Sequence, residues 1–217
     1  GLPMASGDAE PSFVADGAVG GAAHFTNGVY VSSFTNFRPS NFPSGNASYT
    51  ISVWVRPTAA ACEAAAPISC WGRGVNCGLS YLRFENAGEL RFSNYSEDLS
   101  VTGLGNLADG AWHHIVATYD AEGNRTKKVY VDGELKATRT WAATLKIAND
   151  RPLRLGRKFD NSSAPYEGDM DEFMIFDYAW TAQEAADEYA HKPAASVVVI
   201  GHQEAGIDEP VPVPVLV

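Results

Sequence analysis

The sequence YTISVWV at residues 49–55 decides the class of fold. Every second residue from Tyr49 to Val55 is large and apolar, and Thr50 and Ser52 lie between them. Successive side chains of a β-strand point to opposite sides, so these apolar residues share one face. The pattern ends at Pro57, which has no backbone N–H to donate to a neighbouring strand. This alternation predicts a strand and favours a protein built from β-sheets.

Similar short segments follow one another along the chain, with turn residues between them. They lie at residues 20–32, 68–71, 79–84, 89–92, 112–119, 127–131, 134–136, 153–157 and 170–176. The pairs Asn27-Gly28 and Asp132-Gly133 predict tight turns, because both residue types accept a positive φ. Residues 59–66, rich in Ala and Cys, are predicted to form a loop. Roughly a dozen strands joined by turns predict an all-β sandwich of antiparallel sheets.

One helix is predicted near the C-terminal end, over residues 181–190. Thr181 and Glu184 have the spacing of a capping box, in which each side chain accepts a hydrogen bond from the other residue's backbone N–H. The apolar pattern decays after Pro193, and prolines alternate with valines at residues 210–215. We therefore expect one domain over residues 1–192, followed by an extended tail or linker over residues 193–217.

The charge balance excludes some classes of partner. The chain has 217 residues, with 16 Lys and Arg against 26 Asp and Glu, and its net charge is -10. A general attraction to nucleic acid or to anionic lipid is therefore not expected. No apolar run approaches the roughly 18 residues of a membrane span. Neutral ligands and divalent cations fit this composition better.

The cysteines and the glycosylation sequons favour a secreted origin. Cys62, Cys70 and Cys77 lie within sixteen residues, so two of them are expected to form a disulfide, with three reduced and buried thiols as the alternative. Sequons occur at Asn46, Asn94, Asn124 and Asn161. We therefore expect an extracellular protein that begins as a mature chain or an excised module.

Seven motifs in a fixed order resemble a known family. They are FTNG at residues 25–28, YTISVWVRP at 49–57, GAWHHIVATYD at 110–120, VYVDG at 129–133, LRLGR at 153–157, GDMDEF at 168–173 and YAWTAQE at 178–184. Together they resemble the laminin-G-like, concanavalin A-like jelly-roll domain over residues 22–189. The resemblance implies two curved antiparallel sheets. It also implies an extracellular module of a larger protein that binds glycans or proteins, often with a structural calcium ion.

The acidic stretch YEGDMDEF at residues 166–173 allows two interpretations. The first is a retaining β-glucanase that uses Glu167 and Glu172, although only a β-bulge near Asp171 would bring both to one side of the strand. The apolar pattern changes sides between Met170 and Phe173, which favours such a bulge. The second is a calcium site, because Ca²⁺ accepts a mixture of carboxylates, carbonyls and water. The resemblance points to Asp171 as a ligand, with Asp8 and Asp16 from the N-terminal segment as its expected partners.

Aromatic and amphipathic residues in loops are the candidates for a glycan site, since sugar faces stack on aromatic rings. The first choice is the loop at residues 157–166, which contains Arg157, Phe159, Asp160 and Tyr166. Its sequon at Asn161 counts against it, because an attached glycan would cover the loop. Trp141, and Tyr95 beside Asn94, are further candidates.

The sequence therefore predicts a non-catalytic extracellular recognition or adhesion module, stabilised by calcium and belonging to a larger protein. Its expected partner is a carbohydrate or an extracellular protein, and not a nucleic acid. The alternative is a glycoside hydrolase, or an accessory carbohydrate-binding module of a glycan-degrading enzyme. A spacer without any small ligand would have the same sequence pattern.

Overall fold

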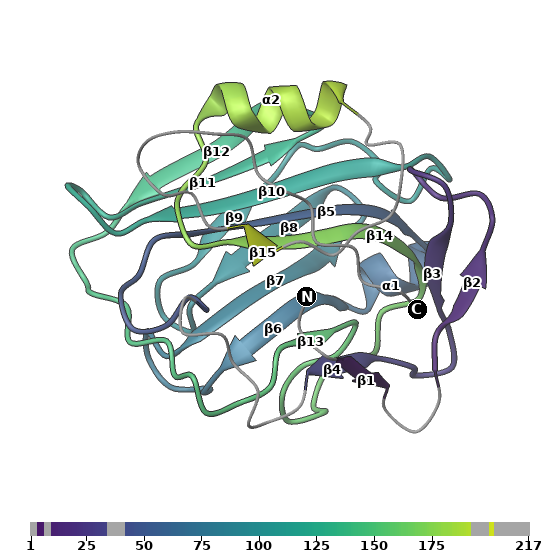
Figure 1. Ribbon diagram of the computed structural model, residues 1–217, viewed down its shortest axis with the longest axis horizontal. Helices are drawn as coiled ribbons and strands as arrows, with labels where there is room; N and C mark the ends of the chain where they lie inside the picture. The colour runs from purple at the N-terminus through teal and green to yellow at the C-terminus, as the bar shows by residue number, and fades with distance from the viewer. Residues whose placement is uncertain (1–3, 7–9, 34–41, 192–199, 202–217) are drawn as a thin grey trace.

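The protein folds as two antiparallel β-sheets packed face to face (Figure 1). The computed structural model describes residues 4–6, 10–33, 42–191 and 200–201. The seven-stranded sheet has the order β1 (Met4–Ser6), β4 (Val31–Ser33), β13 (Arg154–Leu155), β6 (Pro67–Gly72), β7 (Leu79–Asn86), β8 (Glu89–Ser93) and β9 (Leu99–Val101). The eight-stranded sheet has the order β12 (Glu134–Thr140), β11 (Thr126–Val131), β10 (His113–Asp120), β5 (Tyr49–Pro57), β14 (Gly168–Phe176), β3 (Ala22–Phe25) and β2 (Ser12–Val14), and β15 (Ile200–Gly201) pairs with β14. The predicted all-β jelly-roll sandwich is confirmed.

The core lies between the two sheets, and β5 supplies its centre as the alternation at residues 49–55 predicts. The Tyr49 ring meets two aromatic rings of the opposite sheet, Trp71 at 5.3 Å and Phe92 at 5.9 Å between centroids. Its hydroxyl donates to Ser80 Oγ at 2.9 Å, so the polar end of this fully buried side chain is satisfied.

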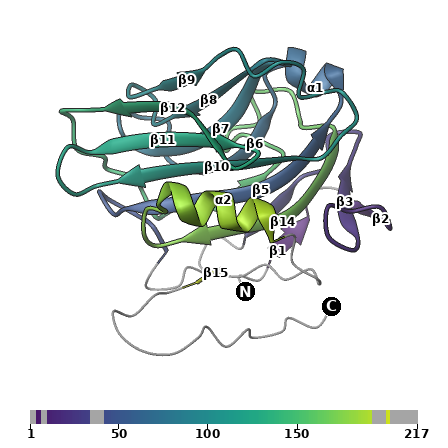
Figure 2. The same ribbon diagram turned by 90° about the horizontal axis from the view of Figure 1, so that it is seen from above.

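The outer face of the eight-stranded sheet is partly covered by the predicted helix, α2 (Ala182–Ala190), as Figure 1 and Figure 2 show. The capping box of Thr181 and Glu184 is present. Tyr189 of α2 stacks on Trp54 of β5 at 5.6 Å, and Trp54 stacks in turn on His114 of β10 at 4.9 Å. The helix thus closes part of this face with an aromatic stack.

Two predicted turns and one predicted irregularity are present. Asp132 and Gly133 have φ values of 52° and 77°, which suits the tight connection from β11 to β12. The Asn27-Gly28 turn, also at positive φ, leads the chain from β3 in one sheet to β4 in the other. The register between β14 and β5 shifts between Asp171 and Met174, so the bulge near Asp171 is confirmed.

The segment predicted as an Ala- and Cys-rich loop contains a short helix, α1 (Ala59–Glu63). Thr58 begins it by accepting a hydrogen bond from the Ala61 N–H at 3.2 Å. The prediction was wrong because alanine has the highest helix propensity and Thr58 is a favoured N-cap, so five residues suffice for one turn.

The predicted disulfide is also corrected, because all three cysteines are free and buried. Cys62 and Cys77 belong to the core between the sheets, whereas Cys70 points from β6 to the outer face and packs there with Leu79 and Tyr81. Burial raises the pKa of Cys70 to about 12 and that of Cys62 to about 11, so both thiols stay protonated at neutral pH.

Three further predictions concern the sequons, a membrane span and the C-terminal tail. Asn94 of the second sequon is fully buried and donates to the Leu79 carbonyl, so the folded chain does not present it for glycosylation. Within the described ranges, no helix combines the length and the apolar character needed to cross a membrane. The tail predicted at residues 193–217 lies outside the described residues except for β15, and the domain division stays a prediction.

Candidate functional site

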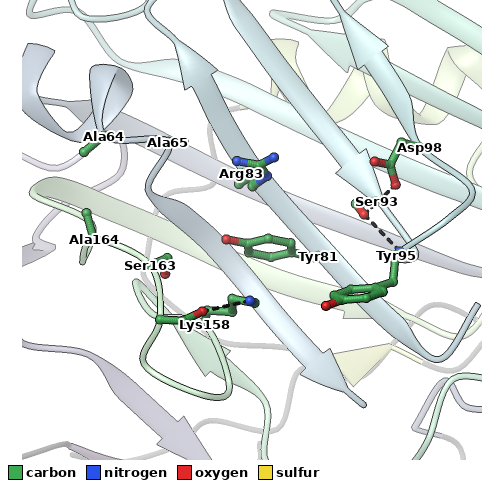
Figure 3. A pocket seen from close by; sticks show the side chains of 11 residues that line it. Ala64, Ala65, Tyr81, Arg83, Ser93, Tyr95, Asp98, Lys158, Ser163 and Ala164 are labelled. Carbon is green, nitrogen blue, oxygen red and sulfur yellow. Dashed lines mark hydrogen bonds between the residues drawn. The ribbon is translucent and has the colours of Figure 1, made fainter. Parts of the chain in front are cut away.

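A cavity of about 470 Å³ opens on the outer face of the seven-stranded sheet (Figure 3). Tyr81 and Arg83 of β7 form its floor, since Leu82 and Phe84, which alternate with them along the strand, turn into the core. Its walls come from Ala64 and Ala65 after α1, from the turn at residues 93–98, and from the loop at residues 158–164. Segments far apart in the sequence therefore meet around one hollow.

The turn after β8 presents an aromatic ring to this cavity. Asn94 is buried and holds the turn to the sheet, while Ser93 Oγ donates to Asp98 Oδ1 at 2.5 Å and accepts from the Tyr95 N–H at 3.0 Å. Tyr95 is left with 50% of its surface exposed and a φ of 77°. A left-handed conformation costs a residue other than glycine about 1–3 kcal/mol, and such strain is frequent at functional sites.

Charged residues on the same face form an alternating chain across the strands. Glu85 of β7 pairs with Arg83 on its own strand and with Arg91 Nε of β8 at 3.1 Å. Arg91 Nη1 lies 3.6 Å from Asp98 Oδ2 on the far side. The guanidinium of Arg83 also lies over the Tyr81 ring, 5.6 Å from its centroid. These contacts fix donors and acceptors in place before any ligand binds.

The loop at residues 158–164 forms the opposite wall. Arg154 of β13 holds it through a hydrogen bond from Nη1 to the Lys158 carbonyl at 2.9 Å. Lys158 Nζ in turn donates to Ser162 Oγ at 2.9 Å and lies 3.2 Å from Asp160 Oδ2. Lys158 and Ser162 line the cavity, with the neighbouring Ser163 and Ala164. The wall is therefore polar and internally cross-linked.

Arranged in this way, the cavity offers an exposed aromatic ring beside cationic and anionic side chains that are held in place by ion pairs. Over residues 25–186, the sequence matches the family model of the concanavalin A-like lectin/glucanase superfamily. The chain belongs to this superfamily. No curated protein matches the sequence.

Several solved structures resemble the chain in fold at low sequence identity. Domain 4 of AbnA, a GH43 extracellular arabinanase from Geobacillus stearothermophilus solved with arabinotriose, is 21% identical with a TM-score of 0.62, and the match covers 85% of this chain and 87% of that one. The CBM40 of the Ruminococcus gnavus IT-sialidase, bound to α2,3-sialyllactose, is 17% identical with a TM-score of 0.60, covering 76% and 95%. The binding domain of Paraclostridial Mosquitocidal Protein 1 is 14% identical with a TM-score of 0.65, covering 87% and 47%. These similarities establish the shared fold.

The structure separates the residues predicted to bind a glycan. The predicted loop does line the cavity, but through Lys158, Ser162, Ser163 and Ala164. Phe159 packs against the buried cluster of Cys70, Leu79 and Tyr81, and Asp160 serves as the partner of Lys158. The Arg157 guanidinium lies beside Gly28, so it supports the turn after β3 and does not line the cavity.

Two further candidates lie elsewhere. Tyr166 is fully buried, packs edge-on against Phe25 at 5.8 Å and donates its hydroxyl to the Asp169 carbonyl at 2.8 Å, so its proposed contact with a surface ligand is corrected. Trp141 is half-buried between two cations, Lys127 at 4.8 Å and Arg139 at 4.6 Å from its ring. Tyr95, named among the loop aromatics, is the candidate that reaches the cavity.

The calcium ion that the superfamily resemblance implies can be tested against the donors around Asp171. Its carboxylate is buried on β14 and accepts backbone N–H groups from Val19 and Glu172, both at 2.9 Å. Burial raises the pKa of this carboxyl, and those same N–H groups act against the rise. Hydrogen-bond donors therefore point at the oxygens that a cation would need.

The other predicted calcium ligands do not complete a shell. Asp16 is exposed and turns its carboxylate to Arg56 Nη1 at 2.8 Å, while Asp8 lies outside the described residues. In the described part of the chain, no three His, Cys, Asp or Glu side chains gather as a metal site. Because Ca²⁺ takes six to eight oxygen ligands, these residues do not fit a calcium ion, and the calcium stays a prediction of the resemblance.

The pair of glutamates considered for hydrolysis lies away from the cavity. Glu172 is the bulge residue of β14, buried and with a φ of 45°. Glu167 precedes β14, and its carbonyl accepts the Thr58 N–H at 3.0 Å. Neither side chain lines this cavity or the second one, a hollow of about 430 Å³ that is bordered by Asp120, Glu122 and Asp177.

Proposed function

We propose that the chain is a non-catalytic carbohydrate-binding module that holds a sugar in the cavity beside Tyr95. The observation that carries this proposal is the strained and exposed Tyr95 ring at the rim of a cavity of about 470 Å³. Ligand pockets usually have about 300–1,000 Å³, and a few fixed polar groups orient the ligand within them. A sugar meets both requirements, because its C–H face packs on a ring while its hydroxyls need paired donors and acceptors.

The neighbouring structures support the proposal without identifying the ligand. Two of them are named as binding modules of glycan-degrading enzymes or as parts of such enzymes, and were solved with arabinotriose and with α2,3-sialyllactose. A module of this kind works outside the cell as one domain of a larger protein, which agrees with the extracellular origin expected from the sequence. An accessory module for glycan degradation is the form of this function that these neighbours favour.

The test is a glycan array followed by calorimetric titration of each glycan that binds. Replacing Tyr95 with Ala should weaken binding at least tenfold, which corresponds to about 1.4 kcal/mol, because the sugar loses its stacking face. The variant Tyr95→Gly should lose the same affinity while its thermal midpoint is unchanged or raised, since glycine accepts the φ of 77° without strain.

Phe13→Ala is the matched control, because Phe13 is an aromatic residue with 78% of its surface exposed on β2 in the other sheet. It should bind every glycan as the wild type does. Binding that survives the loss of the Tyr95 ring but not that of Phe13 would place the site elsewhere. Release of reducing ends during the same incubations, abolished in Glu172→Gln, would support the hydrolase alternative instead.

A further inference from the structure

The outer face of the seven-stranded sheet presents a group of cations in an acidic protein, and Glu85, Asp98 and Asp160 lie among them. The chain has a net charge of -10, yet Arg154, Arg83 and Arg91 lie on β13, β7 and β8, where alternate residues turn outward. Lys158 joins them from the loop after β13. Their placement next to one cavity bears on the chemistry of the ligand that the cavity accepts.

Two of these cations lie on either side of the Tyr81 ring at the floor of the cavity, as Figure 3 shows for Arg83 and Lys158. Each forms an ion pair with a carboxylate that is not among the lining residues, Glu85 for Arg83 and Asp160 for Lys158. The pairs therefore fix the positions of the cations, and nitrogens remain for a ligand, because a guanidinium carries five N–H donors and an ammonium three.

The remaining polar lining groups are hydroxyls, which both donate and accept, and a single carboxylate. Asp98 is the one carboxylate among the residues that line the cavity, and it already accepts the Ser93 hydroxyl and faces Arg91. Burial raises the pKa of Tyr81 to about 12, so its hydroxyl keeps its proton and can donate at neutral pH. Because Arg83 and Lys158 both line this floor, an anionic acceptor matches it better than a neutral hydroxyl does.

We propose that the cavity binds a carboxylated sugar, of the uronic acid or sialic acid class, with its ring against Tyr95 and its carboxylate over Tyr81 between Arg83 and Lys158. This inference rests on the proposed carbohydrate-binding function and specifies its ligand. A carboxylate suits the site because its two oxygens can accept from a planar guanidinium and from an ammonium at the same time. Neutral sugars would offer the two cations only hydroxyl acceptors, whose hydrogen bonds are weaker than those of a carboxylate.

Pairs of ligands that differ only in the acidic sugar or its carboxyl group provide the test. The pairs are 3′-sialyllactose with lactose, and trigalacturonate with its carboxyl-reduced counterpart, each titrated calorimetrically at low and high salt. The acidic member of at least one pair should bind at least tenfold more tightly than the neutral member. This advantage should shrink as salt rises, because ionic contacts at an open site are screened.

The variants Arg83→Gln and Lys158→Gln should each reduce the affinity for the acidic member toward that of the neutral one. Lys136→Gln is the matched control, since Lys136 is exposed on β12 and pairs with Glu134 Oε2 at 2.6 Å. Thermal midpoints show whether each variant is folded. Lys158 lies in a loop, so Lys158→Gln keeps the test decisive if Arg83→Gln does not fold.

Two other outcomes separate the inference from the function on which it rests. Equal binding of acidic and neutral members, both lost in Tyr95→Ala, would overturn the acidic ligand and leave the carbohydrate-binding module standing. If no acidic or neutral saccharide binds, in these pairs or on the glycan array, the proposed function and the inference fall together.

Discussion

The outer faces of the two sheets are used in opposite ways. On the eight-stranded sheet, α2 covers part of the outer face with the Tyr189, Trp54 and His114 stack, and the turn at residues 16–20 reaches Asp171 and Arg56 beside it. On the seven-stranded sheet, the outer face has the cavity, with fixed ion pairs and the exposed Tyr95. One face of this sandwich is therefore packed and contributes to stability, whereas the other keeps an open cavity.

The largest effect expected from this contrast is on stability. Trp54→Ala removes a fully buried ring from the covered face and should lower the free energy of unfolding by about 3–5 kcal/mol, through lost burial and a residual cavity. Tyr95→Ala on the open face should change it by less than about 0.5 kcal/mol. Urea unfolding of both variants measures the difference. Equal losses would mean that the open face contributes to stability as much as the covered one.

Local signals in the sequence predicted three elements of the covered face, but not that the helix packs on it. The alternation at residues 49–55 placed Trp54 opposite the apolar face of β5, and the capping box of Thr181 and Glu184 gave the start of α2. The bulge near Asp171 followed from a shift in the apolar pattern. Each of these features depends on residues close together in the chain, so periodicity and spacing contain it.

The open face was harder to predict, because its cavity depends on pairings over long separations. The register that places Tyr81 against Ser93 and Arg154 against Cys70 brings β7, the turn at residues 93–98 and the loop at residues 158–164 together. Tyr81 and Arg83 alternate with apolar core residues, and this alternation indicates that both side chains point outward. Which loop side chains turn inward depends on contacts such as that from Arg154 to the Lys158 carbonyl, and composition does not reveal them.

Two adjacent histidines, His113 and His114, should make the stability of the protein depend on pH in opposite directions. Burial under the stack lowers the pKa of His114 to about 4, against its usual 6.5, and nearby Asp132 opposes this shift. As pH falls from about 6.5 to 4, His114 therefore becomes protonated in the unfolded chain while it stays neutral in the folded chain. The free energy of unfolding should fall by about 3 kcal/mol over this range. Below the folded pKa this loss is complete.

His113 should act with the opposite sign, because its hydrogen bond with Asp132 raises its pKa. Its stabilising contribution is present below the usual pKa and is lost as pH rises through the folded value. Urea unfolding from pH 4 to pH 8 should show a shallower fall toward acid in His114→Gln than in the wild type, and a steeper fall in His113→Gln. Identical pH profiles in all three proteins would contradict the burial of His114.

The third prediction concerns Asp171, at the part of the covered face where the turn at residues 16–20 packs. Its carboxylate accepts the Val19 and Glu172 N–H groups, and a Cβ at Gly17 would lie 2.8 Å from Asp171 Oδ2, so the turn is shaped around this carboxylate. Asp171→Asn should lower the free energy of unfolding by about 1–3 kcal/mol, because the amide NH₂ meets backbone donors in place of an acceptor. Asp16→Asn is the control and should cost at most about 1 kcal/mol, since it breaks only an exposed ion pair.

Thermal unfolding with and without calcium distinguishes this hydrogen-bonded turn from the metal site that the superfamily resemblance implies. Both carboxylate oxygens of Asp171 already accept backbone N–H groups. The thermal midpoint should therefore be the same in EDTA and in millimolar calcium, and Asp171→Asn should be destabilised equally in both. An ion that binds the folded chain alone must raise the midpoint by mass action. A calcium-dependent rise that disappears in Asp171→Asn would therefore establish the predicted metal site, and would show that an ion, in place of backbone amides, joins the N-terminal turn to β14.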